Sequence, residues 1–234
     1  MTQLFLPFQY FSEKNEPGLT SLAGLPLYYD LLVATDLLTS MQKTCRFKRR
    51  GWRDAQIIQS LLLLNIAGGD CVEDIERLEQ DSALRQIMLK ADTHGMRRTQ
   101  RRAFVTRWRK KKQRAFPSPS AIRRYLESCH DAAQEENREV GKAFIPAPNQ
   151  RLESLLGLNK TLIAFAQTQQ PCEVATLDQD ATVVATHKRS ARYSYKKCQA
   201  YQPFNTYWHE QKLLLNSEFR DGNVPAGFEQ CRQL

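Results

Sequence analysis

Residues 177–184 read Leu-Asp-Gln-Asp-Ala-Thr-Val-Val, and they mark the point where the chain changes from a helical pattern to a strand pattern. They belong to a run, 173–186, that is rich in β-branched residues and predicts a strand with an irregular end. Since side chains alternate along a strand, Asp178 and Asp180 should lie on one face. A second strand is predicted at 211–219, followed by an Arg-Asp-Gly-Asn turn at 220–223.

Two carboxylates on one face of a mostly apolar strand have two interpretations. Burial of both is costly unless a cation or hydrogen bonds compensate their charge, and carboxylate oxygens suit Mg²⁺ or Mn²⁺. Alternatively, Asp178 and Asp180 only mark an exposed strand end or a turn. The residues alone leave both interpretations open.

Upstream of this strand the pattern is helical. Apolar residues recur at three- and four-residue spacing between residues 20 and 89, and the acidic side of 72–79 is expected to be a solvated helix face. Ser118 and Pro119 predict the N-cap and first residue of another helix, and a further helix is expected at about 150–167. The proline-rich stretch before it predicts a boundary between a helical region, 1–145, and a second domain, 146–234, in an α+β protein.

The positive charge of the chain is concentrated in one segment. The sequence carries a net charge of +9, and residues 93–126 hold 12 basic residues and no acid, whereas the other 200 residues hold 22 basic and 25 acidic ones. A polyanion neutralises such a cluster, so DNA contact is predicted; a solvated helix face or a linker is the alternative. The candidate DNA-binding residues here are Arg97, Arg98, Arg101, Arg102, Arg107, Arg109, Lys110, Lys111, Lys112, Arg114, Arg123 and Arg124.

A second basic stretch follows the first predicted strand. Between Ala181 and His209 there is no acid, and basic residues alternate with tyrosines, Phe204 and Trp208. This pattern suits a surface that follows a DNA backbone and stacks on bases, or a loop under which the aromatic rings pack. The basic candidates in this stretch are Lys188, Arg189, Arg192, Lys196 and Lys197.

The cysteines, the start of the chain and the apolar stretches exclude several classes of protein. None of the six cysteines forms a Cys-x-x-Cys pair, which argues against a zinc module and favours free thiols in a reducing cytosol. The start of the chain lacks the pattern of a signal peptide, and no apolar stretch is long enough to span a bilayer. A cytoplasmic protein is expected.

The ordered succession of motifs resembles DDE-type insertion-sequence transposases, and within them the insertion-sequence family numbered thirteen-eighty. The stretch 177–184 resembles the family's first catalytic-aspartate strand, and the segments around Pro203 and the turn at 220–223 resemble its following hairpin. Upstream similarities cover nearly the whole chain: 11–14, 22–26, 54–56, 67–70 with Leu78 and Asp81, and 119–126.

This resemblance implies an RNase H-like catalytic domain, in which two Asp and one Glu hold two divalent metals, Mg²⁺ or Mn²⁺, for cleavage and strand transfer of DNA. Asp180 matches the first catalytic and metal-binding Asp, and Asp178 is the reserve candidate. The implied partners are double-stranded DNA with the terminal inverted repeats of a transposon, and further copies of the chain. The implied location is the bacterial cytoplasm, in association with the nucleoid.

The acidic residues that follow Asp180 do not match the family's second catalytic Asp or its Glu. They are Glu210, Glu218, Asp221 and Glu229, and the resemblance places the family's second Asp and its Glu farther along. We therefore expect a transposase truncated after the first catalytic Asp, which binds DNA but is catalytically incomplete. The alternative is a stand-alone DNA-binding regulator or inhibitor of transposition.

Overall fold

The computed structural model describes residues 20–233 except 49, 95, 111–113 and 140, and the described chain packs as two units. One unit ends at Ser128 and the other begins at Cys129, which is before the predicted boundary between 145 and 146. The intervening segment belongs to the second unit because it contacts the turn at 220–223. Arg138 forms an ion pair with Asp221 at 3.3 Å, and the Lys142 carbonyl accepts a 2.9 Å hydrogen bond from Asn223.

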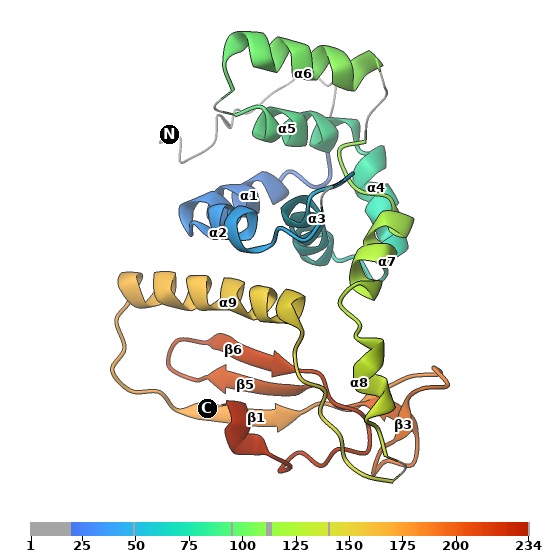
Figure 1. Ribbon diagram of the computed structural model, residues 1–234. Coiled ribbons are helices and arrows are strands. Elements are labelled where there is room, and N and C mark those ends of the chain that lie inside the picture. Colours follow the sequence, from blue (N-terminus) through green and yellow to red (C-terminus); the bar gives the residue numbers. More distant parts are fainter. Residues whose placement is uncertain (1–19, 49, 95, 111–113, 140, 234) are drawn as a thin grey trace. The chain divides into compact units, whose positions relative to one another are not determined.

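The first unit is helical, as the apolar periodicity predicts (Figure 1). Its core is built from apolar side chains of several helices, among them Met41, Ile57, Ile75 and Ile122. Its elements are α1 (Leu25–Ala34), α2 (Leu37–Thr44), α3 (Asp54–Ile66), η1 (Val72–Asp74), α4 (Ile75–Gln80), α5 (Ser82–Asp92), α6 (Arg98–Lys110) and α7 (Pro119–Glu127).

Helix α7 begins where the sequence predicts. The Ser118 hydroxyl oxygen accepts a 3.3 Å hydrogen bond from the Ala121 amide, and Pro119 occupies the first turn, where its missing N–H has no cost. Ile122 and Tyr125 on this helix are buried. No helix in the described part of the chain is long and apolar enough to cross a membrane.

The acidic side of η1 and α4 differs from the expected solvated face. Glu79 accepts 2.9 Å hydrogen bonds from the backbone amides of both Ala115 and Phe116, and the Phe116 side chain is fully buried. Glu76 forms a 2.8 Å ion pair with Arg114. The sequence interpretation was wrong here, because these carboxylates hold the segment that follows α6 against the helical core.

The second unit contains two helices and two small antiparallel sheets (Figure 1). One sheet has the strand order β1-β5-β6, and the other has the order β2-β4-β3. The elements are α8 (Ala132–Glu136), α9 (Gln150–Gln169), β1 (Leu177–Ala181), β2 (Val184–Ala185), β3 (Arg192–Tyr193), β4 (Gln199–Tyr201), β5 (Phe204–Trp208), β6 (Leu213–Glu218) and η2 (Gln230–Gln233). An α+β fold with helices preceding the strands is thus confirmed.

The predicted strand at 173–186 is divided between the two sheets. Residues 173–176 are not in a strand; 177–181 form β1 and 184–185 form β2. The Thr182 amide between the two strands donates a 3.1 Å hydrogen bond to the Pro203 carbonyl. The irregular end expected from the sequence is therefore a crossing from one sheet to the other. The predicted strand at 211–219 is confirmed as β6.

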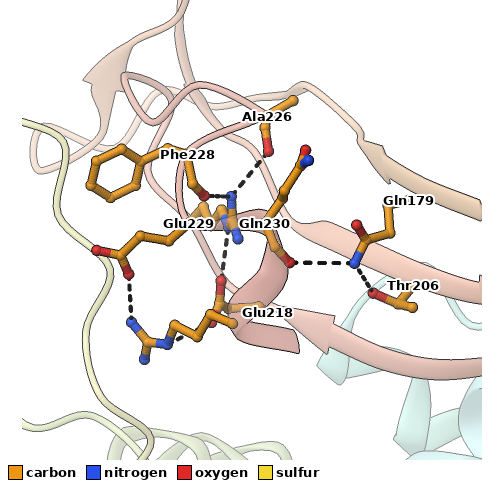
Figure 2. Close-up of polar contacts among 9 residues, drawn as sticks. Gln179, Thr206, Glu218, Ala226, Phe228, Glu229 and Gln230 are labelled. Atoms are coloured by element: carbon orange, nitrogen blue, oxygen red, sulfur yellow. Dashed lines mark hydrogen bonds and ion pairs between the residues drawn. The ribbon is translucent and has the colours of Figure 1, made fainter. Parts of the chain in front are cut away.

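A buried arginine organises the end of this unit. Arg220 is fully buried, with its guanidinium 4.1 Å from the centre of the Phe204 ring. It pairs with Glu218 at 2.8 Å and donates to the carbonyl oxygens of Ala226 and Phe228 at 3.3 and 2.8 Å. Figure 2 labels these three acceptors. The C-terminal segment is thereby fixed against the β1-β5-β6 sheet.

Gly222 lies where two backbones meet. A Cβ atom at this position would be 2.5 Å from the Ala200 carbonyl oxygen and 2.6 Å from that of Arg192. Only a residue without a side chain lets the turn at 220–223 pack against the β3–β4 hairpin.

We predict that Gly222→Ala lowers the free energy of unfolding of the second unit by about 1–3 kcal/mol, because two carbonyl groups must move to admit the methyl group. Urea unfolding measures the difference. Gly157→Ala is the control, since Gly157 lies in α9 and its Cβ would meet nothing within 4 Å. That substitution should stabilise the chain by about 0.5–1 kcal/mol. Equal effects of the two substitutions would contradict the close packing at Gly222.

Candidate functional site

The two aspartates of β1 lie on one face of an edge strand. In the β1-β5-β6 sheet, Asp178 is opposite Tyr207 and Asp180 is opposite Asn205. Directly opposite residues of antiparallel strands share a face, so both carboxylates lie on the face that carries these two side chains. Both aspartates are exposed. The structure therefore brings the two predicted carboxylates together on one open surface.

The other face of the same sheet is closed. Phe204 and Trp208 of β5 are buried there, together with the hydroxyl-bearing Thr206. From β1, the Gln179 amide donates to the Thr206 hydroxyl at 3.2 Å and to the Gln230 carbonyl at 3.5 Å (Figure 2). Closure of this face fixes which way the aspartates of β1 point.

Glu210 fixes the start of β1 beside the turn between β5 and β6. Its carboxylate accepts a 2.8 Å hydrogen bond from the Thr176 amide and a second one from the Thr176 hydroxyl. These hydrogen bonds hold the pKa of Glu210 well below its usual range, at about 2. The His209 amide donates back to the Thr176 carbonyl at 3.0 Å. Glu210 thus helps to fix the register of β1, the strand that carries the two aspartates.

The other acids after Asp180 also have structural partners. Glu218 pairs with Arg220, and its position opposite Phe204 places it on the closed face, away from Asp180. Asp221 is buried beside Arg138 at 3.3 Å. Glu229 lies 3.4 Å from Arg232. Glu210, Glu218 and Asp221 are thus engaged in contacts between separate segments of the second unit, and Glu229 forms a local ion pair on the surface.

The aspartate face does not by itself form a complete metal site. In the part of the chain that the structure describes, no group of three His, Cys, Asp or Glu side chains could hold a metal ion. Asp178 and Asp180 could supply two carboxylates to a hard divalent cation, and further ligands would have to come from elsewhere. No reaction step through a metal follows from these residues alone.

Helix α6 presents an exposed arginine surface. Arg98, Arg101 and Arg102 are spaced three and four residues apart, so they neighbour one another on the helix, and all three are exposed, as is Arg97 before them. Among the described residues, no acid forms an ion pair with these four. The side chains of Arg107, Arg109 and Lys110, and residues Lys111 and Lys112, lie outside the described part of the structure.

The last three candidates of the first basic segment make structural contacts. Arg114 is half-buried in its pair with Glu76, and its Nε donates to the Phe116 carbonyl at 3.0 Å. Arg123 pairs with Glu73. The exposed Arg124 donates to the Ser120 carbonyl at 3.2 Å. The partners of Arg114 and Arg123 are 38 and 50 residues away in the sequence, which is why a local pattern did not reveal them.

The second basic stretch forms β2, β3, β4 and β5 with their connections. Arg192 is half-buried in β3, and the exposed basic residues are Lys188, Arg189, Lys196 and Lys197. The aromatic residues divide into two groups, since Phe204 and Trp208 are buried whereas Tyr193 and Tyr195 are exposed, and base stacking stays a prediction for the exposed pair. The structure thus separates a packed aromatic group in β5 from an exposed one in the β3–β4 hairpin.

The chain was compared with known protein families, curated proteins and solved structures. The family model described as Transposase DDE domain group 1 matches residues 15–234. No curated protein and no solved structure matches the chain.

We predict that Glu210→Gln weakens the pH dependence of stability in acid. The carboxylate of Glu210 has a pKa of about 2 in the folded chain against 4.5 as its ordinary value, so its stabilising effect is complete above 4.5 and is lost as the pH falls towards 2. Urea unfolding of the wild type and of Glu210→Gln across this range measures the effect. The free energies of unfolding of the wild type and of Glu210→Gln should converge as the pH falls towards 2. A constant difference at every pH would contradict the assignment.

Proposed function

Because the chain belongs to the family described as Transposase DDE domain group 1, we propose that it acts on DNA in the transposition of an insertion sequence. The observation that carries this proposal is that one polypeptide contains two surfaces suited to DNA chemistry. One is the arginine surface of α6, and the other is the open carboxylate face of β1.

The arginine surface of α6 is proposed to bind the phosphates of double-stranded DNA. Arg98, Arg101 and Arg102 offer planar guanidinium groups that can each contact phosphate oxygens, and the described acids leave their charge available. Such contacts position a protein on DNA without specifying its sequence. Recognition of terminal inverted repeats, and assembly of several copies on them, are part of the same proposal and need additional contacts.

The carboxylate face of β1 is proposed to supply the first acid of an RNase H-like catalytic site, with Asp180 as the metal ligand and Asp178 as the reserve. The antiparallel pairing of the aspartate strand β1 with the following hairpin of β5 and β6 supports this assignment. When bound by a complete set of acids, Mg²⁺ or Mn²⁺ polarises the phosphate and activates the attacking oxygen. In this chain the role of Asp180 is to present an exposed carboxylate on a strand of fixed register.

We propose that these 234 residues bind DNA without cutting it. The support is the engagement of Glu210, Glu218, Asp221 and Glu229 in structural contacts. The same observation favours a second candidate function, a DNA-binding regulator that occupies transposon ends. A regulator of this kind should prefer the terminal inverted repeats over unrelated DNA by a wide margin.

We predict that the triple substitution Arg98→Ala, Arg101→Ala, Arg102→Ala weakens duplex binding and lowers its salt dependence. Each lost phosphate contact reduces the slope of log affinity against log salt by about 0.9, so the triple variant should lose roughly 2–3 units of slope. Fluorescence anisotropy with a labelled duplex over a series of salt concentrations measures both quantities.

The matched control removes the same charge elsewhere in the first unit, through Lys43→Ala, Arg77→Ala and Lys90→Ala, all at exposed positions. Equal losses in the two triple variants would show that only net charge matters and would contradict the assignment to α6. The wild-type chain should bind plasmid DNA in Mg²⁺ or Mn²⁺ without nicking it. Metal-dependent nicking that disappears in Asp180→Ala would overturn the catalytic incompleteness.

A further inference from the structure

The hairpin formed by β3 and β4 displays two tyrosine rings to solvent. Tyr193 is 68% exposed and Tyr195 is 75% exposed, the two highest values among the large hydrophobic side chains described as exposed. Between them, Ser194 is buried. Rings of this size normally bury most of their apolar surface, so two such rings on one hairpin tip indicate a surface that a partner covers.

The tip of this hairpin is closed by its own hydrogen bonds. The Ser194 amide donates to the Cys198 carbonyl at 2.8 Å, and the Lys197 amide donates to the Ser194 carbonyl at 2.9 Å. Lys197 adopts a left-handed backbone conformation, with φ of 58°. The tyrosines are therefore carried on a defined turn, which reduces the conformational entropy that a partner must remove on binding.

The base of the hairpin is fixed to the rest of the second unit. Ala200 is fully buried, and its carbonyl lies against Gly222. The Tyr201 and Phe219 rings are 4.8 Å apart at an angle of 50°. This contact between the half-buried Tyr201 and the exposed Phe219 ties the end of β4 to the residue that follows β6, and Tyr193 and Tyr195 have no part in it.

The charge around the exposed rings is entirely positive in the local sequence. Residues 182–209 contain no acid, and Lys188, Arg189, Lys196 and Lys197 are exposed. The Lys196 ammonium is 5.9 Å from the centre of the Tyr195 ring. A partner must therefore combine negative charge with flat apolar groups that can stack.

Unpaired nucleotides meet both requirements. Their phosphates are anionic, and their bases offer free faces to aromatic side chains, whereas the bases of an intact duplex are stacked on one another. An acidic peptide would supply the charge but not a series of flat faces. The chemistry of the hairpin therefore favours nucleic acid with open bases over both duplex DNA and acidic protein.

We propose that the β3–β4 hairpin binds an unpaired segment of DNA, with Tyr193 and Tyr195 stacked on bases and with Lys188, Arg189, Lys196 and Lys197 near the phosphates. This inference rests on the proposed function, since it assumes that the chain acts on DNA. It adds a second mode of contact to the duplex binding assigned to α6. Opening base pairs has a free-energy cost, which stacking on the two rings offsets.

The test compares a blunt DNA duplex with the same duplex carrying a single-stranded DNA tail. The wild-type chain should bind the tailed DNA more tightly, and Tyr193→Ala/Tyr195→Ala should lose about tenfold or more of its affinity for that DNA while keeping its affinity for the blunt duplex. Tyr193→Phe/Tyr195→Phe is the matched control and should retain the preference, because it keeps both rings. A fluorescent adenine analogue in the tail should be quenched by the wild type and the Phe variant, but not by the Ala variant.

Four outcomes would overturn the proposal. They are equal affinity of the wild type for tailed and blunt DNA, an equal loss on both probes in the Ala variant, an unquenched analogue in the wild-type complex, and tighter binding of the same tail made of RNA. Failure of the proposed function is distinct, since the wild type would then bind neither the blunt duplex nor the tailed DNA.

Discussion

The antiparallel pairing of β1 with β5 is the interaction on which the candidate site depends. Its register places Asp178 and Asp180 opposite Tyr207 and Asn205, on the open face of the sheet. A slip by one residue would turn both carboxylates onto the closed face, among buried aromatic side chains. The hydrogen bonds between Thr176 and the turn at 209–210 oppose such a slip at one end of β1. At the other end of β1, the hydrogen bond from the Thr182 amide to the Pro203 carbonyl and the pairing of β2 with β4 in the second sheet oppose it.

The buried charged residues of the second unit stabilise the region in which β1 pairs with β5. Removing the Arg220 guanidinium from water costs roughly several kcal/mol, and the ion pair with Glu218 and two carbonyl acceptors offset that cost. Its guanidinium also stacks on Phe204, the residue opposite Ala181. Asp221 is held by Arg138 in the same region. Glu218 and Asp221 are thus engaged in contacts that stabilise the fold, whereas the two aspartates of β1 are exposed.

Local patterns predicted the parts of the fold that depend on local chemistry. The Ser118 cap, the strand β6 and the shared face of Asp178 and Asp180 follow from capping preference and side-chain alternation. The remainder depends on contacts between residues far apart in the sequence. The acidic side of α4 holds Arg114 and two backbone amides, and Thr182 donates to the Pro203 carbonyl. Which tyrosines are exposed also followed only from the hairpin geometry, since the sequence showed no more than their alternation with basic residues.

We propose that the exposed carboxylates of Asp178 and Asp180 are the surface available to a divalent cation, whereas Glu210, Glu218 and Asp221 have structural roles. Paramagnetic broadening of backbone amide signals by Mn²⁺, followed by nuclear magnetic resonance on the full chain, tests this claim most directly. We expect broadening centred on Asp178, Asp180 and the facing Asn205, and its loss when both aspartates are changed to Asn. Broadening centred instead on Glu210, Glu218 or Asp221 would contradict it.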